Sequence, residues 1–380
     1  MLKIGILAGE SSGDLLAGRL ITDFKKQYPD TTFTGICGPQ MRNAGCECLH
    51  PLEELSVMGI SEVIWRLPAL LKIKKSILRY FLDNPPDVLI GVDFPEFNFS
   101  VERRLRQAGI KTAHYVSPSV WAWRESRLRS ISRSTGLMLT IFPFESIYYK
   151  NYNIPVKYVG HPLADEIGLS TDKDSYRSRL GLPVDSKVIA IMPGSRRNEL
   201  ERHLPPFIDA VNRLAQEKGK LCFISNLVSE SDASYMQEYI DKHANGIECR
   251  LFTGKSIPVM AAADIILLAS GTVALEAMLL KRPMVVAYKV NWMTYQIARR
   301  LITLPYVSLP NILAREKVVP ECIQQECNGA VICNELKKLM ENQTLIENTR
   351  IIFTNLHKEM ISDNRENIVT ALYNYAVNSR

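Results

Sequence analysis

Residues 1–14 read MLKIGILAGESSGD, and this stretch decides the fold class. The run Lys3–Ala8 is short and, after its first residue, apolar, as expected of a buried β-strand. Gly9 and Gly13 then bracket a turn from which a helical stretch begins. A buried strand that passes through a glycine-containing turn into a helix opens a βαβ unit, so the sequence predicts a parallel α/β sheet.

The same alternation of short apolar runs and helical stretches continues along most of the chain. The predicted strands are Lys3–Ala8, Phe33–Cys37, Val88–Val92, Thr112–Val116, Leu137–Phe142, Lys157–Val159, Val188–Met192, Leu221–Ser225, Arg250–Phe252, Ile265–Ala269 and Pro283–Tyr288. A more polar stretch from Asp165 to Pro183 separates the two groups of strands. We therefore expect two Rossmann-like domains that face a cleft, residues 1–165 and residues 166–343.

The last residues, 344–380, are expected to form a helical tail. Ile368, Leu372 and Ala376 recur at intervals of four residues, which places them on one face of a helix. Such a tail could pack on either domain or on another subunit.

Composition places the chain among ordinary globular proteins. Of its 380 residues, 46% are hydrophobic and 23% are charged, which excludes a disordered chain. The net charge of +6 suits an anionic substrate or an anionic membrane face, but it is too small for a protein that coats nucleic acid. The N-terminus lacks a secretory pattern, and the eight cysteines fit neither a disulfide scaffold nor a zinc spacing. We expect a cytoplasmic protein without a metal site and without a nucleic-acid partner.

In doubly wound domains, ligands bind outside the carboxyl ends of the strands, so the residues that follow each strand are functional candidates. The turn Gly9–Asp14 offers free N–H groups at a helix start, which favour an anion or a polar ligand. An ordinary turn with a serine or aspartate as helix cap explains it equally well. Asp93 ends the strand Val88–Val92, where a carboxylate could serve as a general base. The alternative is that Asp93 caps the next helix or shapes the turn before Pro95.

The first half holds two further candidate sites, a cluster of two tryptophans and an arginine and a single histidine. Trp121, Trp123 and Arg124 lie within four residues of one another after a predicted strand, and they could wall a sugar or anion site. Packing at a domain interface is the alternative. His161 lies near the expected domain junction, where both a structural and a functional role stay open.

In the second half, residues 192–196 read MPGSR after the first predicted strand. The Gly-Ser turn and the arginine could hold a pyrophosphate, although no Walker motif is present. Residues 270–276, SGTVALE, repeat the arrangement after a later strand. There Glu276 could accept hydrogen bonds from ribose hydroxyls, or it could form a capping box with Thr272.

Residues 62–82, EVIWRLPALLKIKKSILRYFL, have the pattern of a helix that meets anionic lipid. On a helical wheel, an apolar face is formed by Leu70, Leu71, Ile73, Ile77, Leu78 and Phe81. Basic residues gather on the other face. The membrane-facing candidates are Trp65, Leu70, Leu71, Lys72, Lys75 and Arg79. A core helix with a solvated basic edge is the alternative.

Nine stretches, in one order along nearly the whole chain, resemble the lipid-A-disaccharide synthase family of bacterial glycosyltransferases. They are GESSGD at 9–14, GPQMRNAG at 38–45, GVDFPEFN at 91–98, YVSPSVWAWR at 115–124, FPFE at 142–145, YVGHPLAD at 158–165, PGSRRNE at 193–199, SGTVALE at 270–276 and YVSLPNIL at 306–313. Each stretch is weak alone, but nine in the same order leave little room for chance.

The resemblance implies a GT-B-type architecture and an inverting transfer without a cofactor or a metal. The donor would be UDP-2,3-diacylglucosamine and the acceptor 2,3-diacylglucosamine 1-phosphate, lipid X. The products would be the β-1,6-linked tetraacyl disaccharide 1-phosphate of lipid A and UDP. Because both substrates are acylated, the enzyme would work as a peripheral protein on the cytoplasmic face of the inner membrane of a Gram-negative bacterium. The family also allows a homodimer in which the C-terminal tail is exchanged.

The resemblance also assigns roles to residues. Asp93 matches the essential aspartate and would take the proton from the acceptor 6-hydroxyl, while Glu10 and Ser12 match a motif needed for activity. The nucleotide-binding residues would be Gly194, Ser195, Arg196, Ser270, Gly271, Thr272, Glu276 and Asn311, with Arg196 on the pyrophosphate. The acceptor and cleft candidates are Asp14, Asn98, Ser117, Trp121, Trp123, Arg124 and His161.

Two other functions share part of this pattern. A different UDP-sugar enzyme of the same architecture, such as a UDP-N-acetylglucosamine epimerase or the peptidoglycan glycosyltransferase, would share the nucleotide half but lack the stretches at 91–98 and 115–124. A non-catalytic UDP-sugar binder on the membrane surface would keep residues 62–82 and would not need Asp93.

Overall fold

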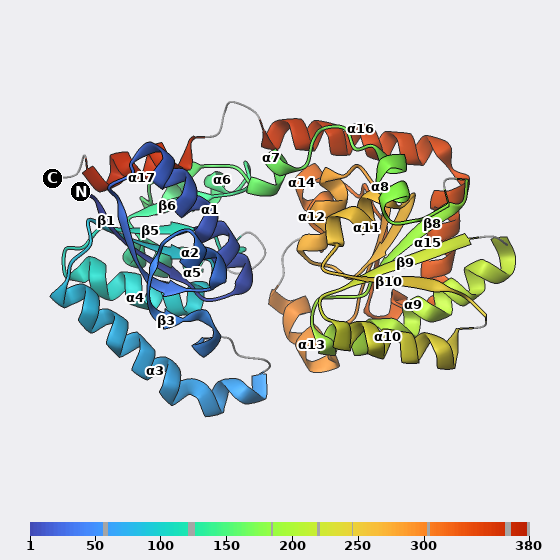
Figure 1. Ribbon diagram of the computed structural model, residues 1–380, viewed down its shortest axis with the longest axis horizontal. Helices are drawn as coiled ribbons and strands as arrows, with labels where there is room; N and C mark the ends of the chain where they lie inside the picture. The colour runs from blue at the N-terminus through green and yellow to red at the C-terminus, as the bar shows by residue number, and fades with distance from the viewer. Residues whose placement is uncertain are drawn as a thin grey trace. The chain divides into compact units, whose positions relative to one another are not determined.

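The computed structural model describes residues 1–55, 60–120, 126–183, 185–218, 221–244, 246–301, 305–361 and 366–377. The chain divides into two compact units, one made of Met1–Pro162 with Ser362–Arg380 and the other of Leu163–Ile361 (Figure 1). Each unit contains a parallel β-sheet with helices on both faces, which confirms the predicted pair of α/β domains. Within the described residues, no helix is long and apolar enough to span a bilayer.

The first unit is built on a 7-stranded sheet in the order β3-β2-β1-β4-β5-β6-β7. Its strands are β1 (Lys3–Ala8), β2 (Thr32–Cys37), β3 (Glu47–Pro51), β4 (Val88–Val92), β5 (Thr112–Tyr115), β6 (Leu137–Thr140) and β7 (Val156–Tyr158). Its helices are α1 (Ser11–Gln27), α2 (Pro39–Asn43), α3 (Ile60–Asp83), α4 (Pro95–Gln107), α5 (Ser126–Ser134), α6 (Ser146–Tyr149) and α17 (Ile368–Val377). The strand order reverses between β1 and β4, the point at which doubly wound sheets bind ligands.

The core of the first unit explains why its central strands are apolar throughout. Helices α3 and α4 pack against β1, β2 and β4 on one face, with Ile77, Phe81 and Val101 fully or almost fully buried. Helices α1 and α17 pack on each other on the opposite face (Figure 1). Every residue of β4 is buried, as expected of a parallel strand that is covered on both faces.

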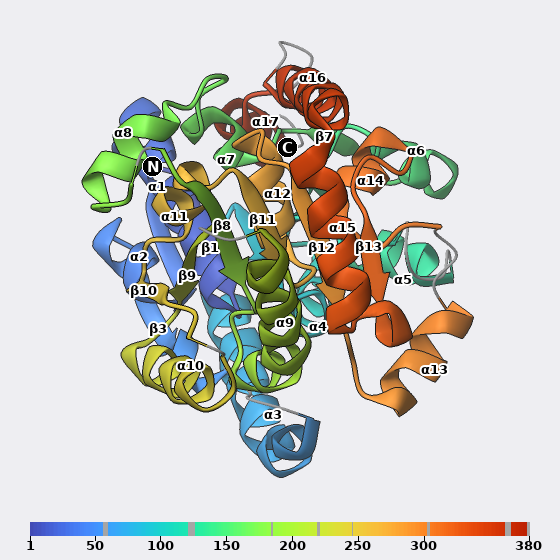
Figure 2. The same ribbon diagram turned by 90° about the vertical axis from the view of Figure 1, so that its right-hand side faces the viewer.

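The second unit is built on a 6-stranded sheet in the order β10-β9-β8-β11-β12-β13. Its strands are β8 (Lys187–Met192), β9 (Leu221–Leu227), β10 (Cys249–Thr253), β11 (Ile265–Leu268), β12 (Met284–Tyr288) and β13 (Glu321–Ile323). Its helices are α7 (Pro162–Glu166), which begins at the boundary, α8 (Lys173–Arg179), α9 (Arg197–Lys218), α10 (Glu230–His243), α11 (Ser256–Ala262), α12 (Thr272–Leu279), α13 (Trp292–Leu301), α14 (Leu309–Ala314), α15 (Gly329–Glu341) and α16 (Gln343–Met360). Helices α9 and α15 lie side by side over the core of this unit (Figure 2). Here the strand order reverses between β8 and β11.

Two strands are absent from the sequence-based prediction, and both lie at a sheet edge. The edge strand β3 is half-buried over most of its length, and β13 is three residues long. An edge strand needs no continuous apolar run, because one of its sides does not face the core. The apolar pattern therefore predicts the central strands and misses these two.

The C-terminal residues divide between the two units. Helix α16 packs with α12, α14 and α15 of the second unit, whereas α17 packs on α1 of the first. Tyr373 of α17 stacks on Tyr28, with ring centroids 4.0 Å apart, and the Lys111 ammonium donates to the Ala376 carbonyl. The segment that returns to the first unit is thus shorter than the expected tail 344–380, because the apolar face of α16 is already buried in the second unit.

Candidate active site

The carboxyl ends of β1 and β4 bring two of the sequence motifs into contact. Ser12, in the first turn of α1, donates a hydrogen bond from Oγ to Asp93 Oδ2 over 3.2 Å. The turns interlock as well, because a Cβ atom at Gly9 would lie 2.2 Å from Cδ1 of Phe94. Glu10 is the N-cap residue of α1 and is exposed. The first sheet therefore gathers Glu10, Ser12 and Asp93 at its switch point.

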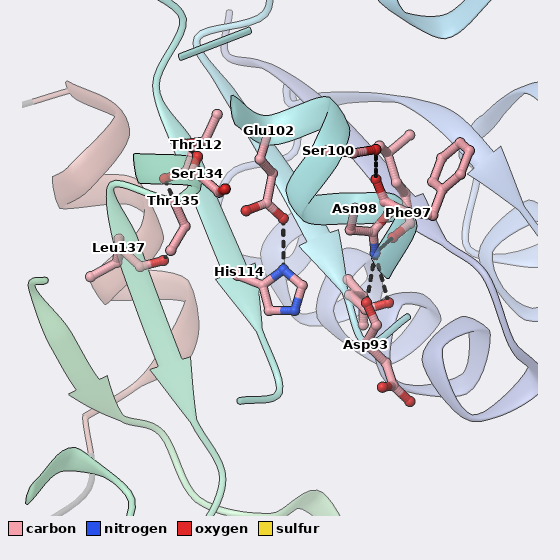
Figure 3. Close-up of polar contacts among 12 residues, drawn as sticks. Asp93, Phe97, Asn98, Ser100, Glu102, Thr112, His114, Ser134, Thr135 and Leu137 are labelled. Carbon is pink, nitrogen blue, oxygen red and sulfur yellow. Dashed lines mark hydrogen bonds and ion pairs between the residues drawn. The ribbon is translucent and has the colours of Figure 1, made fainter. Parts of the chain in front are cut away.

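The backbone at Asp93 has an uncommon conformation. Asp93 and Phe94 have φ angles of 52° and 46°, in the left-handed region that costs a non-glycine residue roughly 1–2 kcal/mol. The N–H of Asp93 donates to the Tyr115 carbonyl over 2.9 Å, and Asn98 Nδ2 donates to the Asp93 carbonyl over 2.7 Å. Figure 3 shows the Asn98 amide directed at this turn and the Asp93 carboxylate pointing away from it. The turn is therefore held through its backbone, and the carboxylate is left at the strand end.

Two acceptor candidates of the first unit have structural partners. Asp14 is buried, and its carboxylate accepts hydrogen bonds from the N–H groups of Gly38, Gln40 and Met41 over 2.9–3.1 Å. It thereby caps the start of α2. The buried Ser117 hydroxyl lies 2.6 Å from the Tyr149 hydroxyl. Both side chains are engaged in hydrogen bonds that hold the loops next to the site.

Some predicted residues lie outside what the structure describes. Trp121, Trp123 and Arg124 fall in the gap between residues 120 and 126, and the side chain of Trp65 is likewise not described. His161 is described, and it is 9% exposed beside Phe142, with ring centroids 5.8 Å apart. Burial, with a smaller contribution from the charge of Arg19, lowers the pKa of His161 to about 4. The imidazole is therefore neutral in the folded protein at neutral pH.

Burial of neutral His161 predicts a loss of stability in acid. The unfolded chain takes up this proton below its ordinary pKa of 6.5, whereas the folded chain resists until about 4. The contribution is therefore complete above pH 6.5 and declines as the pH falls toward 4. We expect the free energy of unfolding of His161→Phe to fall less than that of the wild type, by up to about 2 kcal/mol between about pH 7.5 and about pH 5. Urea unfolding at the two pH values measures this, and identical pH slopes for both proteins would contradict it.

In the second unit, the loop after β8 holds the predicted pyrophosphate residues. The N–H groups of Ser195 and Arg196 donate to Glu199 Oε2 over 3.1 and 3.4 Å, so Glu199 caps the start of α9. Arg196 also pairs with Glu199, and its side chain is 73% exposed. Gly194 has a φ of 134°, and a Cβ atom there would lie 2.6 Å from Glu199 Cβ. The loop thus needs glycine at 194 and presents an exposed guanidinium beside a helix start.

A buried histidine that the sequence reasoning missed supports this loop. His203 is fully buried on α9, and Nδ1 lies 2.9 Å from the Pro193 carbonyl. The N–H of Lys289 donates to Nε2 over 3.1 Å, which fixes the tautomer with the proton on Nδ1. Burial lowers the pKa of His203, and the acceptor role of Nε2 requires the neutral ring. Its helical spacing with Leu200, Leu204 and Phe207 was the available signal, because these residues share the buried face of α9.

The loop after β11 holds the second nucleotide segment. Thr272 begins α12, with Gly271 as the N-cap residue and without a side-chain cap, so the capping alternative for Thr272 is not what is observed. Ser270 precedes them at the strand end, and both Gly271 and Thr272 are exposed. Glu276, one turn later, accepts a hydrogen bond from Ser256 Oγ over 2.8 Å. Burial raises the pKa of Glu276, and the hydrogen bond from Ser256 opposes this.

Asn311, a predicted nucleotide-binding residue, is held by hydrogen bonds within the protein. It is fully buried, and its amide group donates to the Val319 carbonyl and to Glu321 and accepts from the N–H groups of Val318 and Val319. Every polar atom of the side chain is thus engaged with the protein. Asn311 thereby fixes the segment between α14 and β13.

Helix α3 uses its apolar face in a different way from the helical-wheel expectation. Ile73, Ile77 and Phe81 pack in the core of the first unit, as the alternative interpretation has it. Among the membrane-facing candidates, Leu70 is half-buried, and Leu71, Lys72, Lys75 and Arg79 are exposed. The outer face of the described part of α3 is therefore basic with Leu71, 56% exposed, among the charges.

The fold is similar to that of solved structures at low sequence identity. A UDP-GlcNAc 2-epimerase from Neisseria meningitidis, bound to UDP-GlcNAc, has a TM-score of 0.63 at 14% identity and covers 95% of this chain and 98% of its own. A ugt transferase from Siraitia grosvenorii, in complex with UDP, has a TM-score of 0.61 at 11% identity, with coverage of 100% and 99%. These likenesses concern the fold, and they confirm the predicted GT-B type.

Sequence similarity is far higher to one family. A model of that family, described as Lipid-A-disaccharide synthetase, matches residues 4–372. A lipid-A-disaccharide synthase from Vibrio campbellii is 46% identical over 358 residues, which cover 94% of this chain and 93% of the relative. Another from Pseudoalteromonas translucida is 45% identical over 380 residues, with 98% of each chain covered. Identity at this level over nearly the whole length means that the chain belongs to the lipid-A-disaccharide synthase family, whose members are glycosyltransferases that form the lipid A disaccharide.

Proposed function

We propose that the chain transfers the 2,3-diacylglucosaminyl group from its UDP derivative to the 6-hydroxyl of 2,3-diacylglucosamine 1-phosphate. The products are the β-1,6-linked disaccharide 1-phosphate and UDP. Family membership supports the reaction. The observation that carries the proposal is the Ser12–Asp93 contact at the switch point of the first sheet.

Asp93 is the general base in this proposal. The 6-hydroxyl oxygen attacks the anomeric carbon on the face opposite UDP, the bond to UDP breaks, and the hydroxyl proton passes to the Asp93 carboxylate. One displacement of this kind inverts the configuration and needs no covalent intermediate. Ser12 donates to Oδ2 and so orients the carboxylate, while the backbone contacts of Asp93 keep its position fixed.

The second unit binds the nucleotide in this proposal. Arg196 stabilises the negative charge that grows on the leaving diphosphate, an interaction that is stronger in the transition state than with the substrate. The start of α12, where Gly271 and Thr272 are exposed, adds the positive end of a helix. In this proposal Glu276 accepts hydrogen bonds from the ribose hydroxyls, and Ser256 donates to its carboxylate within the protein.

We also propose that the outer face of α3 holds the enzyme on anionic lipid, so that acylated substrates are reached at the membrane surface. Replacing Lys72, Lys75 and Arg79 by glutamine removes about 1 kcal/mol of attraction per residue. We expect binding to vesicles that contain phosphatidylglycerol to weaken roughly a hundredfold in a co-sedimentation assay at low salt.

The control variant for the membrane proposal removes the same charge elsewhere on the first unit. Lys26, Arg129 and Arg133 are exposed on α1 and α5. Replacing these three by glutamine is expected to weaken vesicle binding much less. Equal losses in the two triple variants would show that net charge, rather than α3, attracts the protein to lipid.

A product assay tests the proposed reaction. The purified chain in mixed micelles receives UDP-2,3-diacylglucosamine and the 1-phosphate acceptor, and mass spectrometry follows the disaccharide while UDP is counted. We expect one disaccharide per UDP. UDP release without disaccharide would mean hydrolysis and would refute the acceptor. If neither product appears, a different UDP-sugar reaction or a non-catalytic binder is favoured.

A further inference from the structure

We propose that the buried pair Glu102–His114 is a positioning element for Asp93, an inference that rests on the role of Asp93 in the proposed function. Both side chains are fully buried, and Nδ1 of His114 lies 2.6 Å from Oε1 of Glu102. Glu102 lies on α4 and His114 on β5 (Figure 3). The pair therefore links the helix that follows Asp93 to the strand that flanks it.

The Asp93 turn depends on both of these elements. Its N–H donates to the carbonyl of Tyr115, the residue after His114 on β5. Its carbonyl accepts from Asn98, which lies four residues before Glu102 and so on the same face of α4. The contacts close a ring that runs from Asp93 through β5 to His114, across to Glu102, and back along α4 through Asn98. Without the Glu102–His114 contact, α4 and β5 are no longer joined next to Asp93, and the backbone of Asp93 is held less firmly.

The packing at Gly91 shows how close this cluster lies to the strand that carries the base. A Cβ atom at Gly91, two residues before Asp93, would lie 2.1 Å from Glu102 Oε1. It would also lie 2.9 Å from Asn98 Cβ and 3.0 Å from His114 Nδ1. Only glycine fits here, because α4 and His114 press directly on the β4 backbone.

Stability alone does not favour this cluster. Among the residues that the structure describes, the buried side-chain atoms without a protein hydrogen-bond partner are Asn98 Oδ1, Glu102 Oε2 and His114 Nε2. Each such atom costs about 1–3 kcal/mol, which an apolar cluster would avoid. Local rules of this kind are broken mainly where function imposes another requirement. Here that requirement is a fixed backbone at two consecutive residues with left-handed φ angles.

The pair acts on the base through the backbone and does not touch it. Figure 3 shows the Asp93 carboxylate pointing away from Asn98, on the side opposite Glu102. Glu102 and His114 are therefore positioning residues, and their effect must appear in kcat rather than in substrate binding. A displacement of about 1 Å at a reacting group can reduce the rate about a hundredfold.

Two substitutions at Glu102 test this. Glu102→Gln keeps an oxygen that accepts from His114 Nδ1, whereas Glu102→Leu removes the acceptor at similar volume. For Glu102→Leu we expect kcat to fall about tenfold to a hundredfold, with KM for both substrates and Kd for UDP near wild-type values. For Glu102→Gln we expect kcat within about threefold of wild type.

A double variant separates positioning from folding. Replacing both partners of a buried polar pair by apolar groups is close to neutral for stability. We therefore expect Glu102→Leu/His114→Phe to unfold at or above the wild-type temperature and to lose as much kcat as Glu102→Leu. A matched control is Thr112→Val, which removes the hydrogen bond to the Ser134 carbonyl at the other end of β5. It should lower the unfolding temperature and leave kcat unchanged.

The outcomes distinguish this inference from the function on which it rests. Asp93→Asn is measured alongside. If Asp93→Asn loses kcat while the double variant keeps wild-type kcat, the positioning role is refuted and the base assignment stands. If Asp93→Asn keeps wild-type kcat, the base assignment itself is refuted, and any loss in the Glu102 variants has another cause.

Discussion

Asp93→Asn is expected to lower kcat at least about a hundredfold, because a positioned general base contributes about 10² to 10⁴ in rate. The substitution is isosteric, and Ser12 can still donate to the side-chain oxygen at position 93. UDP affinity should not change, since the proposed nucleotide residues belong to the second unit. Steady-state kinetics with both lipid substrates and calorimetry with UDP measure the two effects.

The control for this variant is Asp87→Asn, which replaces another aspartate of the first unit. Asp87 accepts from the Lys3 N–H at the opposite end of β1, and it should be kinetically silent. A loss of UDP affinity in Asp93→Asn equal to its loss in kcat would contradict the base assignment, because a general base contributes to the chemical step alone.

Arg196→Ala is the substitution with the second-largest expected effect. A charged donor aimed at developing negative charge contributes about 10² to 10³ to kcat, so we expect a loss in that range. The Kd for UDP should rise by a smaller factor, because part of the same interaction exists in the ground state. Stopped assays of UDP release, together with calorimetry, separate the two numbers.

The neighbouring Arg197 supplies the matched control. Its guanidinium lies 3.6 Å from the centroid of the Tyr235 ring and pairs with Glu201. Arg197 is therefore engaged with side chains of α9 and α10. Arg197→Ala should keep kcat within about threefold. If the two alanine variants behave alike, the loop needs only general positive charge, and the specific role of Arg196 fails.

The sequence predicts the central strands well because burial on both faces leaves an uninterrupted apolar run. The prediction for β4, Val88–Val92, matches the structure residue for residue. The edge strands β3 and β13 were missed because they lack a continuous apolar run, whereas the edge strands β7 and β10 were predicted. The two-unit α/β architecture follows from the central strands alone, since the alternation with helices requires parallel crossovers.

Which residues follow a strand is readable from sequence, but what their side chains contact is not. Ser12 and Asp93 are 81 positions apart, and only the pairing of β1 with β4 brings them together. Asp14 and Asn311 also lie in motifs shared with the family, but the side chains of both form hydrogen bonds within the protein. A motif therefore indicates a site without separating the residues that touch the ligand from those that hold the loop.

The supporting residues were missed for a related reason. His203, Glu102 and His114 are polar side chains at positions that the local pattern marks as buried. Such a position indicates only that a partner exists. Its identity depends on the sheet order, which places α9 over the loops after β8 and β12, and α4 over β5.

A crystal structure of the Asp93→Asn variant with UDP-2,3-diacylglucosamine and the 1-phosphate acceptor tests the central claim most directly. We predict the acceptor 6-hydroxyl oxygen within about 2.6–3.2 Å of the side chain at position 93, with the diphosphate against the Arg196 guanidinium. A complex in which the 6-hydroxyl faces another carboxylate or imidazole, with position 93 beyond hydrogen-bond reach, would contradict the account.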